Sequence, residues 1–370
     1  MKVNKPIIIL LCLFLAGCWD QNMMKNAVLV QVLSLDLASD DKFTLGVSIP
    51  IIEDSSGGAQ SLVKSETFSA TGPTPREIRR SIDREISGIL DTSKNKLILF
   101  GKQMASSADI YPLLDVFWRD PRNSLGATLG VVEGDAVDLL NIQPKHETNV
   151  SEYIQDALTS AEENSIIPNE TIQTLASQML DPGEDIVLPY LKMNGKKSAV
   201  VVGLALMDER KYAGNLSPQD SALLLLLKDK KGKYARFTKK LNNKEPYKLN
   251  NYISFNVQHL KRKLKVQVKN GEVYVMLNLN LKLNIEEYPK GDVPKEIEKL
   301  NKILSKELTN DTERVITKLQ QTNCDALGIG RRLMAFQPHS WKSLDKKEYF
   351  KNIQFHTNVK VDIISHGIVL

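Results

Sequence analysis

Hydrophobic side chains alternate with mostly polar ones over a long run in the C-terminal third of the chain. Every odd position from Val273 to Ile285 is Val, Leu or Ile, and the positions between carry Asn, Lys, Tyr and Met. Strict period two predicts a strand with one face on a core and the other towards solvent. Segment 264–268 alternates as well, and Asn270-Gly271 between the two runs is a strong hairpin signal. A long two-stranded hairpin therefore constrains the fold of this region.

A long amphipathic helix is predicted after this hairpin. It begins at Pro294 and ends at Gln320, and its buried stripe consists of Ile297, Leu300, Leu304, Leu308, Val315 and Leu319. Alternation over 353–364 predicts a last strand. We therefore expect the C-terminal third to be an antiparallel sheet with a long helix laid across it. Strands grouped together with helices segregated to one face indicate the α+β class.

The first third of the chain is predicted to mix strands and helices. A helix is expected from Thr74-Pro75, because the threonine hydroxyl can cap it and proline suits its first turn. Its expected apolar face consists of Ile78, Ile82, Ile86, Ile89 and Leu90. Further strands are predicted over 28–37, 43–49, 96–100 and 127–132, and helices over 109–117 and 134–140.

The middle of the chain is predicted to begin with a helical stretch over 150–180, which ends at the turn residues Asp181-Pro182-Gly183. Strands are expected over 187–191 and 199–207, with a polar hairpin tip over 208–211. Ser217-Pro218 then opens another helix, with serine as its cap. The apolar block 222–227 is expected to be a buried helix or strand rather than a membrane segment, because Lys228 ends it.

A short apolar run near the start of the chain leads into the sequence Leu-Ala-Gly-Cys, which ends at Cys18. Two lysines precede the run 6–16, which is shorter than the roughly 20 residues that span a bilayer. These features are typical of a secretory signal peptide. The four residues also resemble the lipobox of bacterial lipoproteins, in which the cysteine receives a diacylglyceryl group and becomes the first residue of the mature chain. We expect a signal peptide over 1–17 and lipid attachment at Cys18; an ordinary signal peptide with a chance cysteine is the alternative.

The composition fits an exported globular protein. Cys12 would leave with the signal peptide and Cys18 would carry lipid, so Cys324 alone remains and no internal disulfide is expected. The formal net charge of +5 is too small to indicate a nucleic-acid partner. The chain is long enough for two or three hydrophobic cores.

The sequence lacks the patterns that carry known chemistries. Its five histidines (His146, His259, His339, His356 and His366) have no second ligand at metal spacing, and no nucleophile elbow or P-loop occurs. Gly328-Ile329-Gly330 lacks a third glycine and does not follow a predicted strand, so a dinucleotide site is rejected. Cys324 is a candidate nucleophile only by elimination, and a small core residue is the better interpretation. We therefore expect no catalytic residue, no metal site and no cofactor.

Six short segments occur in order along the chain: Gly17-Cys18-Trp19-Asp20, Ser69-Ala70-Thr71-Gly72, Phe117-Trp118-Arg119-Asp120-Pro121-Arg122, Gly214-Asn215-Leu216-Ser217-Pro218, Asp325-Ala326-Leu327-Gly328-Ile329-Gly330 and Pro338-His339-Ser340-Trp341-Lys342. In sequence and order they resemble motifs of the C subunits of bacterial spore germinant receptors, the GerAC lipoprotein family. Ile329 departs from the family pattern, which has an aromatic residue there. The resemblance marks eight positions for a structural or interface role: Asp120, Pro121, Ser217, Pro218, Asp325, Gly328, Gly330 and Trp341.

The resemblance implies three consecutive α+β domains, each a mainly antiparallel sheet flanked by helices, which we place at 18–145, 146–250 and 251–370. It also implies a lipoprotein without established catalytic activity on the outer face of the spore inner membrane. Its partners would be a multi-spanning A subunit and a transporter-like B subunit. Such receptors sense amino acids, sugars or nucleosides and trigger the release of ions and dipicolinate.

Two alternatives stay open. A solute-binding lipoprotein of a membrane transporter is the second functional hypothesis, although the long hairpin argues against its two-lobed architecture. For the 325–330 segment, Asp325 either caps a short helix beginning near Ala326 or shapes an interface, and the cap is the favoured interpretation.

Overall fold

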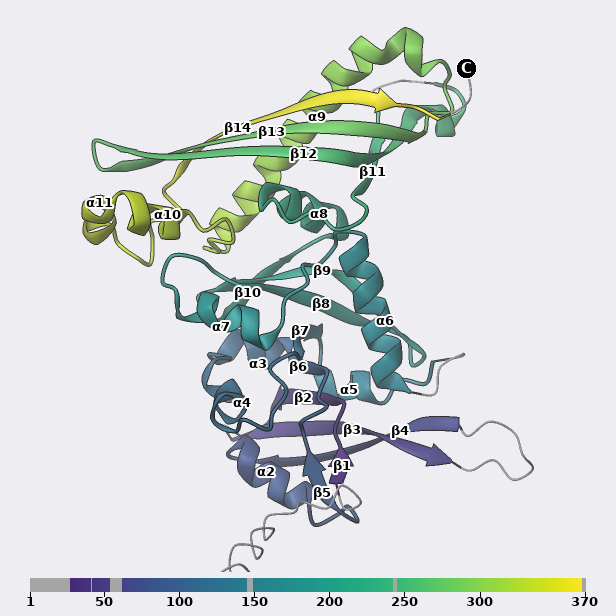
Figure 1. The fold of residues 1–370 in the computed structure, drawn as a ribbon, viewed down its shortest axis with the longest axis vertical. Helices are drawn as coiled ribbons and strands as arrows, with labels where there is room; N and C mark the ends of the chain where they lie inside the picture. Colours follow the sequence, from purple (N-terminus) through teal and green to yellow (C-terminus); the bar gives the residue numbers. More distant parts are fainter. Residues whose placement is uncertain (1–26, 41, 54–61, 145–148, 242–244, 368–370) are drawn as a thin grey trace, which may run out of the picture.

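An eight-stranded sheet forms the centre of the N-terminal and middle parts of the protein (Figure 1). The computed structural model describes residues 27–40, 42–53, 62–144, 149–241 and 245–367. The expected signal peptide 1–17 and Cys18 lie outside these residues. In spatial order the strands are β10 (Lys211–Leu216), β9 (Ser198–Asp208), β8 (Val187–Asn194), β7 (Thr128–Glu133), β6 (Leu97–Gly101), β2 (Val32–Leu37), β3 (Phe43–Glu53) and β4 (Leu62–Gly72).

The centre of this sheet is parallel and its two ends are antiparallel. Strands β2, β6, β7 and β8 pair in parallel, whereas β3 and β4 on one side and β9 and β10 on the other pair antiparallel. Strand β6 is buried on both faces, with Leu97 and Leu99 in one hydrophobic cluster and Ile98 and Phe100 in the other. Burial on both faces explains why this strand is an unbroken apolar run. A small parallel pair, β1 (Ala27–Leu29) with β5 (Ile89–Asp91), lies at the N-terminal end.

Helices cover both faces of the large sheet. One face packs against α2 (Pro75–Ile82), α3 (Lys102–Ser107), α4 (Asp115–Arg119) and α7 (Ile172–Leu180). The opposite face packs against α5 (Ala136–Leu140), α6 (Val150–Glu163) and α8 (Pro218–Leu227). Two 3-10 turns, η2 (Pro112–Leu114) and η3 (Lys248–Asn251), complete these parts.

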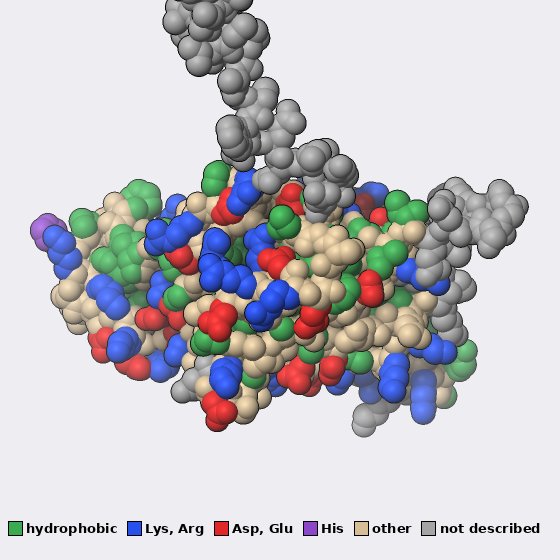
Figure 2. Space-filling model, turned by 90° about the horizontal axis from the view of Figure 1, so that it is seen from below, with side chains coloured by type: hydrophobic (Ala, Val, Ile, Leu, Met, Phe, Trp, Pro, Cys, Tyr) green, Lys and Arg blue, Asp and Glu red, His purple; other side chains and the backbone are tan. Residues whose placement is uncertain are grey.

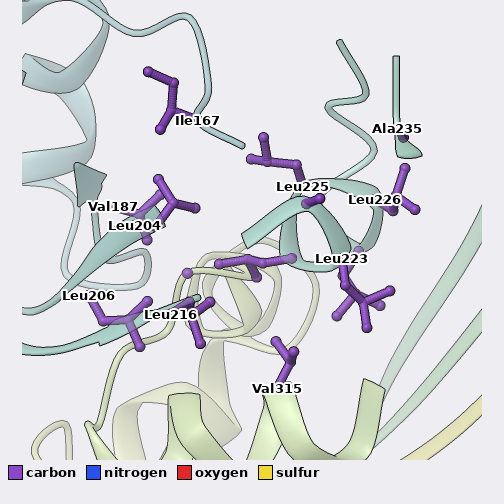
Figure 3. Close-up of a cluster of buried hydrophobic side chains, with 14 of the residues drawn as sticks. Ile167, Val187, Leu204, Leu206, Leu216, Leu223, Leu225, Leu226, Ala235 and Val315 are labelled. Carbon is purple, nitrogen blue, oxygen red and sulfur yellow. The ribbon is translucent and has the colours of Figure 1, made fainter. Parts of the chain in front are cut away.

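Helix α8 is apolar all round and is buried between the two halves of the molecule. Every residue from Ser221 to Leu227 is buried. Figure 3 shows Leu223, Leu225 and Leu226 in a cluster with Leu204 and Leu206 of β9 on one side and Val315 of α9 (Val293–Gln321) below. A helix that is hydrophobic on every side is stable only where apolar side chains surround it. The expected buried element over 222–227 is therefore a helix, and it joins the core of the large sheet to the C-terminal core.

The C-terminal part is a four-stranded sheet with a long helix against it. The strand order is β11 (Arg236–Lys240), β12 (Tyr252–Lys269), β13 (Glu272–Glu287) and β14 (Gln354–Ser365), and the long helix is α9 (Val293–Gln321). The predicted β12–β13 hairpin is confirmed. Asn270 and Gly271 at its tip have φ values of 52° and 83°, as a two-residue type I′ turn requires.

The last strand differs from the sequence expectation. Strand β14 pairs with β13 in parallel, not antiparallel. The 288–353 connection, which contains α9 followed by α10 (Ile329–Phe336) and α11 (Pro338–Ser343), returns the chain to the start of the sheet before β14 begins. Long helical connections of this kind join parallel neighbours.

Two predicted helices are shorter than expected. Thr74 caps α2 as predicted, but α2 ends at Ile82, so Ile86, Ile89 and Leu90 are not on its face. The chain turns because the Asp83 side chain accepts the N–H of Leu90, which lies in β5, at 3.1 Å. The predicted helix over 109–117 is the 3-10 turn η2 followed by the short α4, and α3 was not anticipated.

The α+β class, with antiparallel-rich sheets flanked by helices, is confirmed. The large sheet takes strands from both sides of residue 145, and one hydrophobic cluster extends from Val32 to Ile363. The division at 18–145, 146–250 and 251–370 stays a prediction.

Candidate functional site

The eight predicted motif residues lie in three separate places. Asp120 and Pro121 follow α4, Ser217 and Pro218 begin α8, and Asp325, Gly328, Gly330 and Trp341 gather beside the end of α9. The structure therefore brings together the last four residues and keeps the other two pairs apart.

Asp120 organises a surface turn at the end of α4. Its carboxylate accepts the main-chain N–H of Arg122 at 3.1 Å and lies 2.8 Å from the Arg122 guanidinium. The Arg122 side chain and these hydrogen bonds lower the pKa of Asp120 to about 2. Pro121 is exposed within the turn. The arrangement fixes the path of the chain into β7 and offers no reactive group.

Ser217 is the N-cap of α8, as predicted. Its hydroxyl oxygen accepts the N–H of Asp220 at 3.2 Å, and Pro218 occupies the first turn. Asp220 is also bound from the C-terminal part, because Arg314 Nη2 of α9 lies 2.6 Å from its Oδ1. The same guanidinium contacts Asp311, which pairs with Lys239. This motif therefore caps one helix and links it to another.

Asp325 holds the start of α10 from inside the protein. Its side chain is buried and accepts three hydrogen bonds: from the N–H of Ile329 at 3.0 Å, the N–H of Gly330 at 2.8 Å and the hydroxyl of Tyr349 at 2.6 Å. The helix begins at Ile329 rather than near Ala326, after Gly328 with φ of 66°. The capping contact is thus present, three residues later than expected.

A second loop, residues 181–185, docks against this segment from the middle of the chain. Asp325 N–H donates to Asp185 Oδ2 at 2.7 Å, and Asp185 N–H donates to the Asp325 carbonyl at 3.1 Å. The Arg331 N–H donates to the Gly183 carbonyl at 2.8 Å. We call the contact between segments 181–185 and 325–331 the loop junction.

Two glycines make the loop junction possible. A Cβ on Gly183 would lie 2.4 Å from the Arg331 nitrogen, and one on Gly330 would lie 2.9 Å from Gly183 Cα and 2.6 Å from the Tyr349 hydroxyl. All three distances are well inside van der Waals contact, so the two backbones approach each other as closely as only glycine allows. The Gly-x-Gly pattern therefore serves a close backbone contact.

Aromatic side chains support the same place. Trp341 and Tyr349 pack edge to face with centroids 5.1 Å apart, and Tyr349 contacts Phe350 in the same way at 6.2 Å. The Lys346 ammonium lies 4.0 Å from the centroid of Trp341. Such pairs contribute about 0.5–1.5 kcal/mol beyond their buried area. Trp341 thus positions Tyr349, which in turn binds Asp325.

Charged groups at the loop junction are largely withdrawn from water. Burial raises the pKa of Asp325 to about 6, although its three hydrogen bonds and Lys228 oppose the rise. Burial and the neighbouring charge of Asp325 raise the pKa of Asp185 to about 8. Lys228, with a side chain only 7% exposed, lies 3.3 Å from Glu184 Oε1 and donates to the Ala326 carbonyl.

A pocket of about 660 Å³ opens beside the loop junction. The end of α7, the tip of the β9–β10 hairpin and the 345–351 segment form its walls, and Asp185 and Tyr349 contribute to its lining. Acidic and basic side chains alternate around it, including Asp208, Arg210 and Lys347. The pocket has no dominant charge.

Sequence reasoning missed several residues that build these contacts. No sequence pattern marks Asp185 or Glu184, and Lys228 was interpreted only as the end of an apolar block. In the N-terminal part, buried Asp36 accepts the N–H groups of Ala136 and Val137 at the start of α5. A polar residue inside the apolar strand 28–37 was the available signal for Asp36.

The described residues assemble no catalytic constellation. Cys324 is fully buried, and burial raises the pKa of its thiol, which disfavours the reactive thiolate. Among residues 27–367, apart from the undescribed gaps, no cluster of three or more His, Cys, Asp or Glu could hold a metal. Within that same part of the chain, no helix has the length and hydrophobicity to cross a membrane.

Comparison with known proteins gives consistent results over almost the whole chain. The family described as "Spore germination protein N-terminal domain" matches residues 20–193, and "Spore germination B3/ GerAC like, C-terminal" matches residues 202–367. The chain is 24% identical to spore germination protein GerQC of Bacillus cereus over 98% of each protein. It is 20% identical to spore germination protein KC of Bacillus subtilis, over 98% of this chain and 95% of that protein.

A solved structure shares the fold. The crystal structure of the GerBC protein superposes with a TM-score of 0.57 at 17% sequence identity, covering 90% of this chain and 96% of that one. At this identity the likeness concerns the fold alone. The two family matches cover residues 20–193 and 202–367, and they show that the chain belongs to the GerAC family of spore germinant receptor C subunits.

Proposed function

We propose that this chain is a non-enzymatic, lipid-anchored subunit of a nutrient germinant receptor, attached through Cys18 to the outer face of the spore inner membrane. The observation that carries the proposal is the pair of family matches over residues 20–193 and 202–367. The Leu-Ala-Gly-Cys sequence supplies the anchor. Two acyl chains on one cysteine suffice for stable attachment, because each buried methylene contributes about 0.8 kcal/mol.

The anchor would place the N-terminal end of the molecule nearest the membrane. The first described residue, Ala27, begins β1 at one end of an elongated body, and the C-terminal sheet lies at the other end (Figure 1). Ala27 is nine positions after Cys18, a separation that a chain can span over at most about 30 Å. The end that carries β1, α2 and β5 would therefore lie close to the lipid surface. Figure 2 views the molecule from this end, where basic side chains gather near the centre beside acidic ones.

The proposed mechanism is scaffolding. The eight-stranded and four-stranded sheets share one hydrophobic cluster through α8. The loop junction and the ion pair of Arg314 with Asp220 add polar links between the two parts. A body joined in this way presents fixed surfaces to partners. We propose that these surfaces dock the integral-membrane A and B subunits, and that the complex triggers germination.

The chemistry of the described residues supports a non-enzymatic role. The buried carboxylates of Asp36, Asp185 and Asp325 accept main-chain N–H groups, and the one described cysteine is buried. His259, His339 and His356 are exposed and belong to different elements. Two described serine hydroxyls contact a carboxylate: Ser217 contacts Asp220 at 2.8 Å in a helix cap, and Ser254 contacts Glu287 at 3.1 Å on an exposed strand surface. Neither pair is the arrangement of an activated nucleophile, whose base is itself oriented by a third group.

The proposal is tested in spores that carry Cys18→Ala. We expect these spores to lose the response to one group of nutrients, because the unanchored subunit no longer reaches its partners, while responses to other germinants remain. Protein abundance is followed by immunoblot. Cys324→Ala is the matched control, because it removes a cysteine thiol that cannot carry the anchor.

A normal germination response at normal abundance of the Cys18→Ala protein would contradict the anchored-subunit proposal. A subunit role is tested separately by crosslinking in spore membranes. We expect the wild-type chain to be recovered with multi-spanning membrane proteins, and recovery of the chain alone would contradict scaffolding.

A further inference from the structure

A second pocket lies on the other side of the loop junction and is strongly basic. Its volume is about 450 Å³, and it is formed where the residues after α8, strand β12 and helix α10 meet. Five cationic side chains contribute to its lining, against one acidic side chain, Glu184; the cations are Lys228, Lys230, Arg262, Arg331 and Arg332.

Three of these five cations already have acidic partners. Lys228 pairs with Glu184, Lys230 pairs with Glu170, and Arg331 pairs with Asp181 and Glu184. Arg262 and Arg332 form no ion pair among the described residues. The pocket therefore holds about two positive charges that the surrounding protein leaves unmatched.

Of these two arginines, Arg262 has the more unusual environment. Its Nε and Nη2 atoms are buried, yet neither has a hydrogen-bond partner among the described residues. The acids whose charges act on it, Asp229 and Glu184, form no ion pair with it among the described residues. The side chain as a whole is half-buried, but the N–H groups on these two nitrogens have lost water without gaining a partner, which is costly. Burial and the proximity of Arg332 also lower the pKa of Arg262.

We propose that this pocket binds an oxyanion with two negative charges, of the phosphate class, between the guanidinium groups of Arg262 and Arg332. Guanidinium groups match the geometry of such anions through paired N–H···O bonds. Phe336, which is 77% exposed at the rim, leaves room for an apolar group attached to the anion. The ligand is either a free phosphate compound or a lipid headgroup, which carry the same chemistry.

The site bridges two parts of the chain and is independent of the proposed receptor role. Arg262 belongs to β12, Arg332 belongs to α10 directly after the loop junction, and Lys228 follows the buried helix α8. An anion held here would bind the C-terminal hairpin to the loop junction. Binding should therefore stabilise the contact between the two large sheets.

The test is calorimetric titration of the full chain, purified in detergent, with inorganic phosphate in a buffer free of phosphate and sulfate. We expect saturable binding to the wild-type chain and a loss of affinity of at least about tenfold in Arg262→Gln and in Arg332→Gln. Lys265→Gln is the matched control, because Lys265 lies on β12 but is exposed on the opposite face. Its affinity should change less than about twofold.

A second measurement keeps the test valid if a variant is unstable. Phosphate should raise the melting temperature of the wild-type chain and of Lys265→Gln, but not of Arg262→Gln, whose melting temperature without phosphate should be no lower than that of the wild type. Arg262→Gln removes two buried nitrogens that have no hydrogen-bond partner, and we therefore expect no loss of stability.

The source of the anion is distinguished with vesicles. Binding to phosphatidylcholine vesicles that contain phosphatidic acid, but not to phosphatidylcholine alone, with dependence on Arg262, would identify a lipid headgroup. Phosphate binding without vesicle binding would identify a free anion. The proposal is overturned if neither phosphate nor the acidic vesicles bind, or if Arg262→Gln and Lys265→Gln behave alike.

Discussion

The main-chain N–H of Val361, in the edge strand β14, donates to the hydroxyl of Ser305 on α9 at 2.9 Å. The same contact repeats on both sides: Val359 donates to Thr309 at 3.0 Å and Ile363 donates to Asn301 at 2.9 Å. Four residues of helix rise about 6 Å, and two residues of strand rise about 6.6 Å. The polar side chains at every fourth helical position therefore meet every second N–H of the strand. Helix α9 thus satisfies a sheet edge that would otherwise be open to another strand.

Removing these side chains should weaken the fold and expose the edge of the sheet. We expect Ser305→Ala to lower the free energy of unfolding by about 1–2 kcal/mol, because a partly buried N–H loses its acceptor. The triple variant with Asn301→Ala and Thr309→Ala should lose more and should also self-associate. Urea unfolding and light scattering measure the two effects.

The control for this series is Asn310→Ala. Asn310 is exposed on the same helix, so its replacement gains helix propensity without removing a contact to β14. Equal stability of Ser305→Ala and Asn310→Ala would show that the edge contacts contribute nothing.

Asp325 should be required for folding of the loop junction. Asp325→Ala leaves the N–H groups of Ile329 and Gly330 and the hydroxyl of Tyr349 without their buried acceptor. We expect a loss of about 3–5 kcal/mol, at the upper end for single substitutions. Tyr349→Phe removes one of the three hydrogen bonds and should cost about 1 kcal/mol. Chemical unfolding of the two variants gives both values.

The outcome also decides between the two interpretations of the motif. A strongly destabilised Asp325→Ala chain supports the capping role. An Asp325→Ala chain of normal stability, in spores that no longer germinate, would instead make Asp325 an interface residue.

The features that the sequence predicted well are those that depend on neighbours in the chain. Asn270-Gly271 needs only its own backbone conformation to form the hairpin turn, and Ser217 caps a helix that starts at the next residue. Strict alternation over 273–285 likewise reports on one strand at a time. These local signals were sufficient for the α+β class.

The features that were missed depend on residues far apart in the sequence. Asp185 and Asp325 are 140 positions apart. Nothing in the sequence of segment 181–185 or of segment 325–331 indicates that the two contact each other. The parallel direction of β14 depends on where the 288–353 connection returns the chain, which alternation cannot reveal. The basic pocket likewise needs β12, α10 and the end of α8 together, so no single segment predicted it.

The contribution of Asp325 and Asp185 to stability should fall as the pH rises from about 4 to about 8. Both carboxyls of the loop junction have pKa values above the unfolded value of 3.8, about 6 for Asp325 and about 8 for Asp185. Folding therefore takes up protons in this pH range. The stabilisation that comes from the two protonated carboxyls is fully present below pH 3.8 and is lost as the pH rises through their pKa values in the folded protein. Melting temperatures of the wild type and Asp185→Asn, measured between pH 5.5 and about pH 9, test this.

Other titrating groups affect the melting temperatures of the wild type and of Asp185→Asn equally, so their effects cancel when the two pH profiles are subtracted. We expect the melting temperature of the wild type to fall more steeply than that of Asp185→Asn between pH 6 and about pH 9, because the variant cannot lose the Asp185 proton. Parallel pH profiles would show that Asp185 titrates in the folded protein as it does in the unfolded chain.

Gly330 should tolerate no side chain. A methyl group there would lie 2.9 Å from both Gly183 Cα and Trp341 Cη2 and 2.6 Å from the Tyr349 hydroxyl. Gly330→Ala must therefore push the 181–185 loop or the aromatic side chains away, which we expect to cost about 1–3 kcal/mol.

Gly126→Ala is the matched control, since its nearest contact would be Ser124 Oγ at 3.7 Å, and it should be neutral or slightly stabilising. Urea unfolding measures the stability of both variants. Tryptophan emission, compared between the two variants in an otherwise identical chain, reports a displacement of Trp341, because a shifted ring gains access to water. Equal stability and emission in the two variants would mean that the loop junction is looser than the close approach of Gly183 and Gly330 requires.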